Sequence, residues 1–369
     1  MNTVVILPTY NERENIETLL DRIIDVWRKI PRHTLTILVV DDKSPDGTAD
    51  VVRQYRKKHP FVFLLTKEKE GLGSALLHGI AYALDELKAE IIVQMDADLS
   101  HNPASLPQFM SALDRGGNFA VGSRYIAGGS IPENWGWHRK LFSIVGNGIV
   151  RFGLGYTNVH DWTGGYRAYT EKIARYSRTE LSKYQGYVFQ IAYLHKSILR
   201  GAKIIEVPIR FTDRKFGHSK IAPSQYIRDV LRYVIRQRMK QIVTGSFGKF
   251  LVVGSIGFII NTVLLEAMVW AGFHPALGSA AGAEIAIISN FLLNNAWTFG
   301  SRRVYGWPAL KKFLQFNATS LGAVLIQAGT VWMGTGLFGV GVYRLFYLLG
   351  VGIGLIWNYT MYSKVIWKK

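Results

Sequence analysis

The stretch Ile91-Ile92-Val93-Gln94-Met95-Asp96-Ala97-Asp98 decides the fold of the first part of this chain. The mainly apolar run 91–95 is typical of a buried strand, and two carboxylates follow where that strand ends. Carboxylates one residue apart at the start of a loop can face the same cation, and Mg²⁺ and Mn²⁺ prefer oxygen ligands. Taken alone, the triplet could also be a solvated acidic turn.

Outward from this strand, strand and helix patterns alternate up to about residue 125. Strands are expected at 4–7, 35–40, 61–65, 91–95 and 119–122, and helices at 11–30, from 46, at 71–87 and at 104–114. Asn11 is expected to cap the first helix. This alternation predicts an α/β fold with a mostly parallel sheet that is covered on both faces.

Polar side chains follow the expected ends of these strands. In open parallel sheets, ligands bind beyond the carboxyl ends of the strands. We therefore expect these residues to converge on one crevice: Thr9, Tyr10, Glu12, Asp41, Asp42, Asp96 and Asp98.

The composition indicates more than one soluble domain. The chain has 369 residues, a net charge of +18, 49% hydrophobic residues and no cysteine. The length favours two domains, and the lack of cysteine excludes disulfides, thiolate metal sites and cysteine nucleophiles. The positive charges cluster beside apolar segments. This favours membrane lipids and phosphates as partners and argues against nucleic acid, for which a basic patch interleaved with aromatic residues is expected.

Four apolar segments follow the α/β part, at about 250–272, 277–299, 313–337 and 342–363. As helices they would be about 33–37 Å long, enough to cross a hydrocarbon core of about 30 Å. The alternative is a set of buried helices in a soluble domain, which would need more covering sequence than remains. We expect an α/β domain at 1–222 and an all-α membrane domain at 245–369, with four transmembrane helices in two hairpins.

Basic residues predict the orientation of these helices. They lie before the first span, between the second and third, and after the fourth: Arg228, Arg232, Arg236, Arg238, Lys240, Lys249, Arg302, Arg303, Lys311, Lys312, Lys364, Lys368 and Lys369. The other two loops hold only His274 and Arg344. By the positive-inside rule, the α/β domain and both termini face the cytoplasm. The start of the chain lacks the features of a signal peptide.

Polar residues inside the expected spans are costly in a bilayer and therefore suggest function. Glu266 and Glu284 are the main candidates, with helix–helix hydrogen bonding as an equally weighted alternative. Several asparagines also fall within the spans, and for these the hydrogen-bonding interpretation is favoured.

The segment 223–244 is expected to form an amphipathic helix at the membrane surface. Its apolar residues share one face, and three arginines four residues apart line another: Ile227, Val230, Leu231, Val234 and Ile235, and Arg228, Arg232 and Arg236. A basic amphipathic helix beside a span lies in the headgroup plane. A face of the soluble domain is the alternative. The segment 141–152 is a weaker candidate of the same kind.

Three motifs carry a resemblance to a known family: Pro8-Thr9-Tyr10-Asn11-Glu12, Val40-Asp41-Asp42-Lys43-Ser44-Pro45-Asp46 and Asp96-Ala97-Asp98-Leu99-Ser100-His101. Together they resemble glycosyltransferase family 2, in particular the dolichol-phosphate (polyprenyl-phosphate) mannose synthases with a fused GtrA-like membrane domain. The resemblance covers nearly the whole chain. It implies a GT-A fold, GDP-mannose as donor, dolichyl or polyprenyl phosphate as acceptor, and a divalent metal, Mg²⁺ or Mn²⁺.

The resemblance also implies roles for residues of the donor site. Pro8, Tyr10, Glu12, Val40 and Asp42 are expected to contact the nucleotide. The motif Asp96-Ala97-Asp98 is expected to hold the metal and the diphosphate. Ser100 stands where the family often has a glutamine that binds the metal, so a shorter ligand or a bridging water is expected there.

Four basic residues fall inside segments that match the family. Arg124 and Arg139 are expected near the acceptor phosphate, although Lys140 could take the place of Arg139. Arg214 and Lys220 belong to a basic loop that is expected to close over the donor. The segments 163–167 and 186–190 resemble family segments around the sugar and acceptor, without individual roles.

The expected reaction needs few groups. A phosphate monoester has a second pKa of about 6, so it is a nucleophile at neutral pH without a general base. Guanidinium groups can place it by paired hydrogen bonds, and inversion would give a β-mannosyl phospholipid. His101 is not expected to be essential. The alternatives are a polyprenyl-phosphate transferase that uses UDP-glucose or UDP-N-acetylglucosamine, and a lipid flippase or adaptor with a nucleotide-sensing domain.

Overall fold

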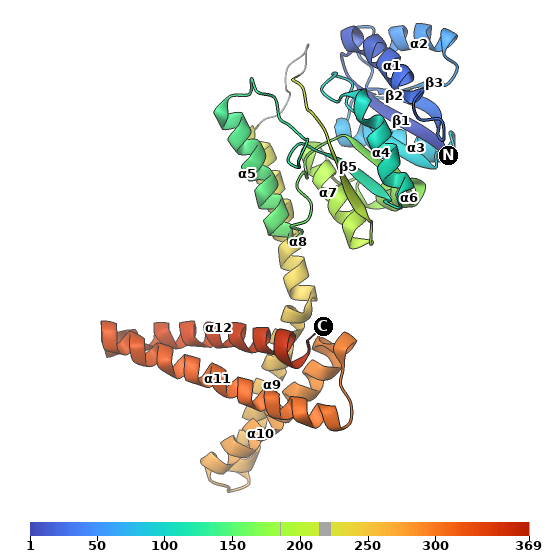
Figure 1. Cartoon of the computed structure of the whole chain (residues 1–369). Helices are drawn as coiled ribbons and strands as arrows, with labels where there is room; N and C mark the ends of the chain where they lie inside the picture. The colour runs from blue at the N-terminus through green and yellow to red at the C-terminus, as the bar shows by residue number, and fades with distance from the viewer. Residues whose placement is uncertain (185, 214–222, 369) are drawn as a thin grey trace. The chain divides into compact units, whose positions relative to one another are not determined.

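The computed structural model describes residues 1–184, 186–213 and 223–368 (Figure 1). The chain divides into two compact units, Met1–Arg236 and Gln237–Lys369. The division falls inside one helix, α8 (Pro223–Thr244), and not at the expected limits of 222 and 245. The reason is that Val230, Tyr233 and Val234 of this helix are buried in the core of the first unit.

The described part of the first unit contains a seven-stranded sheet in the order β3-β2-β1-β4-β6-β5-β7. Its strands are β1 (Asn2–Thr9), β2 (Thr34–Asp41), β3 (Val62–Thr66), β4 (Ile91–Gln94), β5 (Phe119–Ser123), β6 (Arg167–Thr170) and β7 (Ile204–Pro208). Only β6 runs antiparallel to its neighbours, β4 and β5. The mostly parallel α/β fold is confirmed, as are all five strands expected from the sequence.

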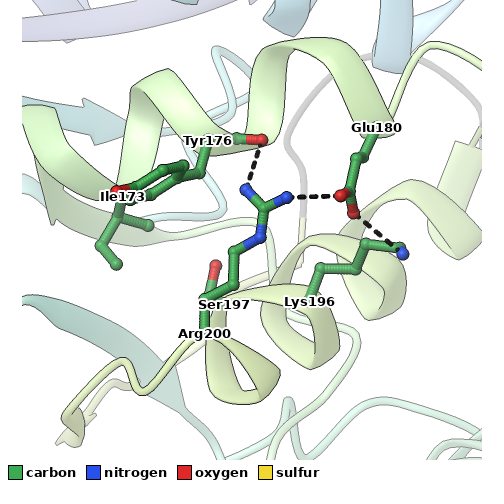
Figure 2. A pocket seen from close by; sticks show the side chains of 6 residues that line it. All are labelled: Ile173, Tyr176, Glu180, Lys196, Ser197 and Arg200. Carbon is green, nitrogen blue, oxygen red and sulfur yellow. Dashed lines mark hydrogen bonds and ion pairs between the residues drawn. The ribbon is translucent and has the colours of Figure 1, made fainter.

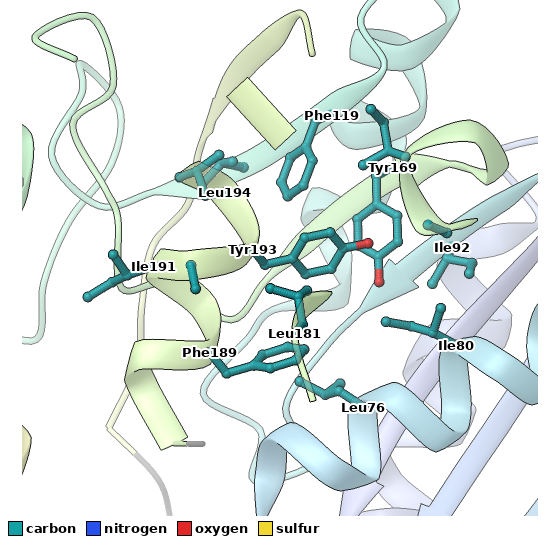
Figure 3. Packing of buried hydrophobic residues seen from close by; sticks show 14 of the residues in the cluster. Leu76, Ile80, Ile92, Phe119, Tyr169, Leu181, Phe189, Ile191, Tyr193 and Leu194 are labelled. Carbon is teal, nitrogen blue, oxygen red and sulfur yellow. The ribbon is translucent and has the colours of Figure 1, made fainter. Parts of the chain in front are cut away.

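Helices cover both faces of this sheet because alternate strand residues point to opposite sides. Val5 and Leu7 of β1 pack with α1, α2 and α4, whereas Val4 and Ile6 pack with the helices of the other face. Figure 3 shows part of this second core, where Phe119, Tyr169 and Tyr193 meet. The helices are α1 (Arg13–Trp27), α2 (Thr48–Lys58), α3 (Leu72–Asp85), α4 (Leu106–Asp114), α5 (Trp137–Leu154), α6 (Glu171–Glu180) and α7 (Gly186–Leu199).

The start of α1 differs from the expected one. Asn11 has a φ of 62° and lies before the helix, and its backbone N–H donates to the Ser44 hydroxyl at 3.0 Å. Asparagine tolerates this left-handed conformation better than most residues. The prediction that Asn11 caps the helix is therefore wrong. Glu12 takes the N-cap position without a side-chain capping bond.

The second unit contains four long helices, α9 (Ser246–Trp270), α10 (Pro275–Leu293), α11 (Trp307–Phe338) and α12 (Tyr343–Met361). α9 packs along α10, and α11 packs along α12, which gives the two hairpins expected from the sequence. Within the described residues, three helices are long and apolar enough to cross a membrane: Ser246–Trp270, Trp307–Phe338 and Leu345–Ile366. The span at α10 stays a prediction.

An aromatic cluster joins the two hairpins at one end. Phe250 of α9, Phe291 of α10 and Phe316 of α11 pack with Tyr362 and Trp367 near the end of the chain. Their rings lie in edge-to-face, tilted and stacked arrangements, with the centroids of paired rings 4.4–6.2 Å apart. Because hairpins alternate in direction, this end holds the start of α9, the connection from α10 to α11, and the C-terminal residues.

Candidate active site

The loop after β4 places the two carboxylates at different depths. The backbone N–H of Met95 donates to the Ile6 carbonyl at 3.2 Å, so pairing with β1 continues to the edge of the loop. The Asp96 side chain is 39% exposed, whereas Asp98 is buried and its Oδ1 accepts the Ser100 N–H at 3.0 Å. Ala97 between them is buried. The loop therefore presents Asp96 at the surface with Asp98 beneath it.

His101 is held tightly beside Asp96. Its Nδ1 accepts the backbone N–H of Asp96 at 3.0 Å, so in the neutral ring the hydrogen is on Nε2. That nitrogen lies 3.8 Å from Asp96 Oδ2. The ring is buried and stacks on Tyr166, with centroids 5.0 Å apart. The sequence interpretation of His101 as not essential overlooked this fixed position.

The loop before β6 packs against the Asp96 carboxylate. A side chain at Gly165 would be crowded, because its Cβ would lie 3.3 Å from Asp96 Oδ1. Arg167 is fully buried and donates to the carbonyls of Trp162, Gly164 and Gln190 at 2.6–3.1 Å. Burial lowers the pKa of Arg167 to about 10, which still leaves it charged at neutral pH. This arginine therefore braces the loop.

Arg124 is paired with Asp161, a residue that the sequence did not single out. Its Nε and Nη2 donate to the two oxygens of the Asp161 carboxylate at 2.7 and 2.8 Å, and Nη2 also donates to the Thr163 hydroxyl at 2.8 Å. Asp161 is completely buried. Burial alone would raise its pKa, but the Arg124 guanidinium outweighs this and holds the pKa of Asp161 below its usual value. Arg124 is thus fixed in place.

Phe211 lies between these groups. Its ring is 5.6 Å from the ring of His101, 5.9 Å from that of Trp135 and 5.5 Å from the Arg124 guanidinium. The next residue, Thr212, donates its N–H to the Ser100 carbonyl at 3.2 Å. The segment after β7 therefore gathers the loop of Asp98 and the end of β5 in one place.

Arg139 at the start of α5 belongs to the same surroundings. Its guanidinium lies 3.9 Å from the Trp135 ring centroid and 3.5 Å from Asp213 Oδ1, and its side chain is 45% exposed. Lys140, the other candidate for this position, donates to the Glu133 carbonyl instead. Arg214 and Lys220 lie outside the described residues, which end at Asp213 on this side.

The expected nucleotide residues lie at the carboxyl ends of β1 and β2. Pro8 pairs with Val40 across these strands, and the side chain of Val40 is fully buried in the core, so it can reach a ligand only through its backbone. Glu12 accepts a hydrogen bond from Asn15 at 2.8 Å. Asp41 binds the hydroxyls of Thr9 and Ser44 and so stabilises the loop.

Two lysines after β3 complete this edge, and the sequence interpretation missed both. Lys67 lies 3.4 Å from Asp42, and both side chains are buried. Burial raises the pKa of Asp42 above its usual value, and the Lys67 ammonium opposes this. Lys69 lies over the Tyr10 ring at 3.5 Å. Their position just past a strand end is the signal that would have found them.

The loop fits a divalent cation through oxygen donors. Asp96 and Asp98 supply carboxylates, and the buried Ser100 hydroxyl has no hydrogen-bond partner among the described residues. An orphaned buried hydroxyl beside two carboxylates is an available hard ligand. In the described part of the chain, no group of three or more histidine, aspartate or glutamate side chains forms a complete metal cage. Substrate oxygens would have to complete the coordination.

A small crevice between α6 and α7 is separate from this chemistry. Figure 2 shows Glu180 between Lys196 and Arg200, with Arg200 also bound to the Tyr176 carbonyl at 2.8 Å. Its volume of about 10 Å³ is too small for a metabolite. The charged groups there fasten the two helices together.

We expect Asp161→Asn to destabilise the protein by about 3–5 kcal/mol at neutral pH, because it leaves the buried Arg124 charge unpaired. Since the pKa of Asp161 is lowered on folding, the pair stabilises above the unfolded value of about 3.8 and this stability is lost as pH falls through the lower folded pKa. Thermal unfolding followed by tryptophan fluorescence checks this, because Trp162 is buried next in the chain.

The matched control for this variant is Glu171→Gln, which breaks an exposed i,i+4 pair with Arg175. It should change the free energy of unfolding by less than about 0.5 kcal/mol. Equal destabilisation by the two variants would contradict the role given to Asp161.

Comparisons with known proteins agree with the two units. A model described as glycosyl transferase family 2 matches residues 4–177, and one described as the GtrA/DPMS transmembrane domain matches residues 249–367. The chain is 30% identical to the dolichol-phosphate mannosyltransferase of Pyrococcus furiosus over 369 residues, which is 100% of this chain and 99% of that protein. It is 40% identical to the polyprenol monophosphomannose synthase of Mycolicibacterium smegmatis over 231 residues, 62% of this chain and 84% of that protein.

Among solved structures, the mannosyltransferase PcManGT from Pyrobaculum calidifontis, in complex with GDP-Man and Mn²⁺, is similar with a TM-score of 0.42 and 17% identity. The match covers 97% of this chain and 86% of that one. The relative that matches over the full length, together with a family model in each unit, identifies the family. This chain is a glycosyltransferase of family 2 that carries a GtrA/DPMS transmembrane domain.

Proposed function

We propose that this enzyme transfers mannose from GDP-mannose to dolichyl or another polyprenyl phosphate, with inversion, at the cytoplasmic face of a membrane. The observation that carries the proposal is the full-length similarity to a protein named dolichol-phosphate mannosyltransferase. The carboxylate loop and the arginines gathered around Phe211 support it.

The donor would lie along the ends of β1, β2 and β4. Tyr10 with Lys69 and Asp42 with Lys67 offer a ring, two ammonium groups and a carboxylate for the nucleotide. A divalent cation, Mg²⁺ or Mn²⁺, held by Asp96 and Asp98 with Ser100 as a further oxygen, would offset the charge of the leaving diphosphate. Arg214 and Lys220 remain proposed contacts to the same diphosphate.

The acceptor would be placed by Arg139 and Arg124. A phosphate oxygen of the lipid forms the new bond to the anomeric carbon of mannose, and the bond from that carbon to GDP breaks with its electron pair on GDP. No proton has to be removed from a phosphate dianion, so no general base is needed. Because Arg124 already binds Asp161, we assign the more direct phosphate contact to Arg139, which is partly exposed.

Two helices of the first unit present apolar faces to the outside. On α5, the exposed residues Leu141, Phe142, Val145, Ile149 and Phe152 recur at helical spacing and form one stripe. On α8, Val230 and Val234 are buried, and Ile227, Leu231 and Ile235 stay exposed beside Arg228, Arg232 and Arg236. The expected single apolar face of 223–244 is therefore divided, and α5 offers the larger surface. We propose that α5 is the main helix by which the first unit binds the membrane, with its apolar stripe in the headgroup plane.

The donor is tested by offering GDP-mannose, UDP-glucose and UDP-N-acetylglucosamine together to the full chain with polyprenyl phosphate and Mg²⁺ or Mn²⁺. We expect mannosyl lipid as the main product, detected by mass spectrometry. Asp98→Ala should lower the rate at least a hundredfold, since it removes a buried metal ligand. A glucosyl or N-acetylglucosaminyl lipid as the main product would overturn the assignment of the donor.

The position of His101 predicts a difference between two substitutions. In a His101→Gln variant, the side-chain amide nitrogen would lie near the position of the histidine Nε2. In a His101→Asn variant, the shorter side chain would place an acceptor oxygen near the position of Nδ1 and no donor near that of Nε2. If the Nε2–H orients the Asp96 carboxylate, His101→Asn should raise the metal concentration for half-maximal transfer about tenfold, and His101→Gln should raise it less. Equal effects of both variants, with equal loss of thermal stability, would reduce His101 to a packing residue.

The docking role of α5 predicts that Phe142→Glu with Phe152→Glu slows transfer to a long polyprenyl phosphate in vesicles by about tenfold or more. Transfer to a short, water-soluble isoprenyl phosphate should be unchanged, because both side chains lie on the exposed face of α5. Leu199→Glu is the control, since Leu199 is similarly exposed on α7. The same loss in the control would show that any exposed charge has this effect.

A further inference from the structure

A cavity of about 360 Å³ lies between the two hairpins of the second unit. All four long helices contribute to its wall, through Gly254 of α9, Asn290 of α10, Gln327 of α11 and Asn358 of α12, among others. It lies next to the aromatic cluster, since Phe250, Phe316 and Tyr362 line both. Its volume is within the range of sites that bind small molecules, about 300–1,000 Å³.

The wall of this cavity includes asparagine side chains whose carboxamide oxygens lack hydrogen-bond partners among the described residues. Asn294 is 2% exposed, and its side-chain oxygen is buried without a hydrogen bond among the described residues, as are the side-chain oxygens of Asn290 and Asn358. A Cβ at Gly257 would lie 2.4 Å from the Asn290 side chain, so the bare backbone of α9 lets Asn290 sit between the helices. Leaving a buried polar group unsatisfied costs about 1–3 kcal/mol.

These groups define the chemistry of an occupant. An isoprenoid or acyl chain would leave the carboxamides unpaired, whereas adjacent hydroxyls can both donate to and accept from them. None of the described residues that line the cavity is charged, and Glu266 and Glu284 are exposed elsewhere on the unit. A buried phosphate would therefore lack a counter-charge, which is unfavourable. The fitting occupant is a neutral group with several hydroxyls.

The surroundings indicate that the occupant is attached to a lipid. Val324 and Leu355 line the cavity and are 59% and 37% exposed, so it opens sideways on the apolar surface of the unit. Lys249 and Lys312 do not line the cavity, since Lys249 lies over the Trp297 ring at 5.6 Å and Lys312 donates to the Val365 carbonyl at 3.3 Å. A neutral head group can enter the cavity from its apolar side while the rest of the lipid stays on the apolar surface.

We propose that this cavity is a second binding site, which takes the neutral polyhydroxyl head group of a membrane lipid. The hexosyl group of a polyprenyl mannosyl phosphate has this chemistry, and that choice of hexose rests on the proposed function. The glycerol head group of phosphatidylglycerol, a bulk membrane lipid, is also a neutral group with several hydroxyls. The carboxamides select for hydroxyls.

Native mass spectrometry of the full chain in detergent tests the site with three supplied lipids: an isoprenyl mannosyl phosphate, the same isoprenyl phosphate without sugar, and phosphatidylglycerol. We expect the mannosyl lipid to bind at least about tenfold more tightly than the sugar-free phosphate. Asn290→Leu with Asn358→Leu should abolish this difference, because leucine is similar in shape but has no hydrogen-bonding group. Preferred binding of phosphatidylglycerol that the same variant abolishes would support the site and assign it to bulk lipid.

Asn261→Leu is the matched control, since Asn261, which lies in α9, likewise has an unpartnered buried oxygen but does not line the cavity. It should leave the lipid preference unchanged. Equal binding of the three lipids to the wild type, or an unchanged preference in the double variant with intact thermal stability, would overturn the proposal. Because the lipids are supplied, a protein that binds the mannosyl lipid but transfers no mannose would disprove only the proposed function.

Discussion

The buried ion pair between Arg124 and Asp161 holds the active-site region together. It joins the end of β5 to the loop that enters β6, and β6 lies antiparallel between β4 and β5. That loop is thereby fixed at the carboxyl end of β4. Gly165 then lies against Asp96, and Tyr166 lies under His101. The exposed Asp96 carboxylate thus lies against a loop that this charge pair fixes in place.

The pairing of Arg124 with Asp161 also gives Arg124 and Arg139 different roles in the proposed reaction. A guanidinium that donates two hydrogen bonds to a buried carboxylate has much of its charge balanced. In the proposed reaction, Arg124 acts mainly by position, and the partly exposed Arg139 takes the direct contact with the incoming phosphate. In the same way, Lys67 balances Asp42 while Lys69 lies on Tyr10, so the proposed donor edge combines one internal pair with one exposed cation.

The two units handle polar groups in opposite ways, and the reason is the dielectric environment. At the water-facing strand ends, carboxylates and ammonium groups can be arranged around a charged substrate. Inside the helical unit, charges would be costly, and the cavity is lined by neutral carboxamides instead. The sequence offered Glu266 and Glu284 as candidates for function in this part, with helix–helix hydrogen bonding as an equally weighted alternative. The asparagines are the ones that converge, because convergence depends on helix rotation and not on residue charge.

The sequence by itself determined the strand–helix alternation, the five strands expected from it, the hairpin pairing of the apolar helices and the carboxylate loop after β4. These features depend on periodicity and on residues close in the chain, and the physics is local. Only the tertiary structure decided which distant groups meet. Asp161 and Phe211 carry no local signal of function. In α8, Val230 and Val234 are buried in the core, although the sequence predicts a helix that lies on the membrane surface. Side-chain partners across β4, β5 and β6 are set by strand order, which the pattern along one chain does not encode.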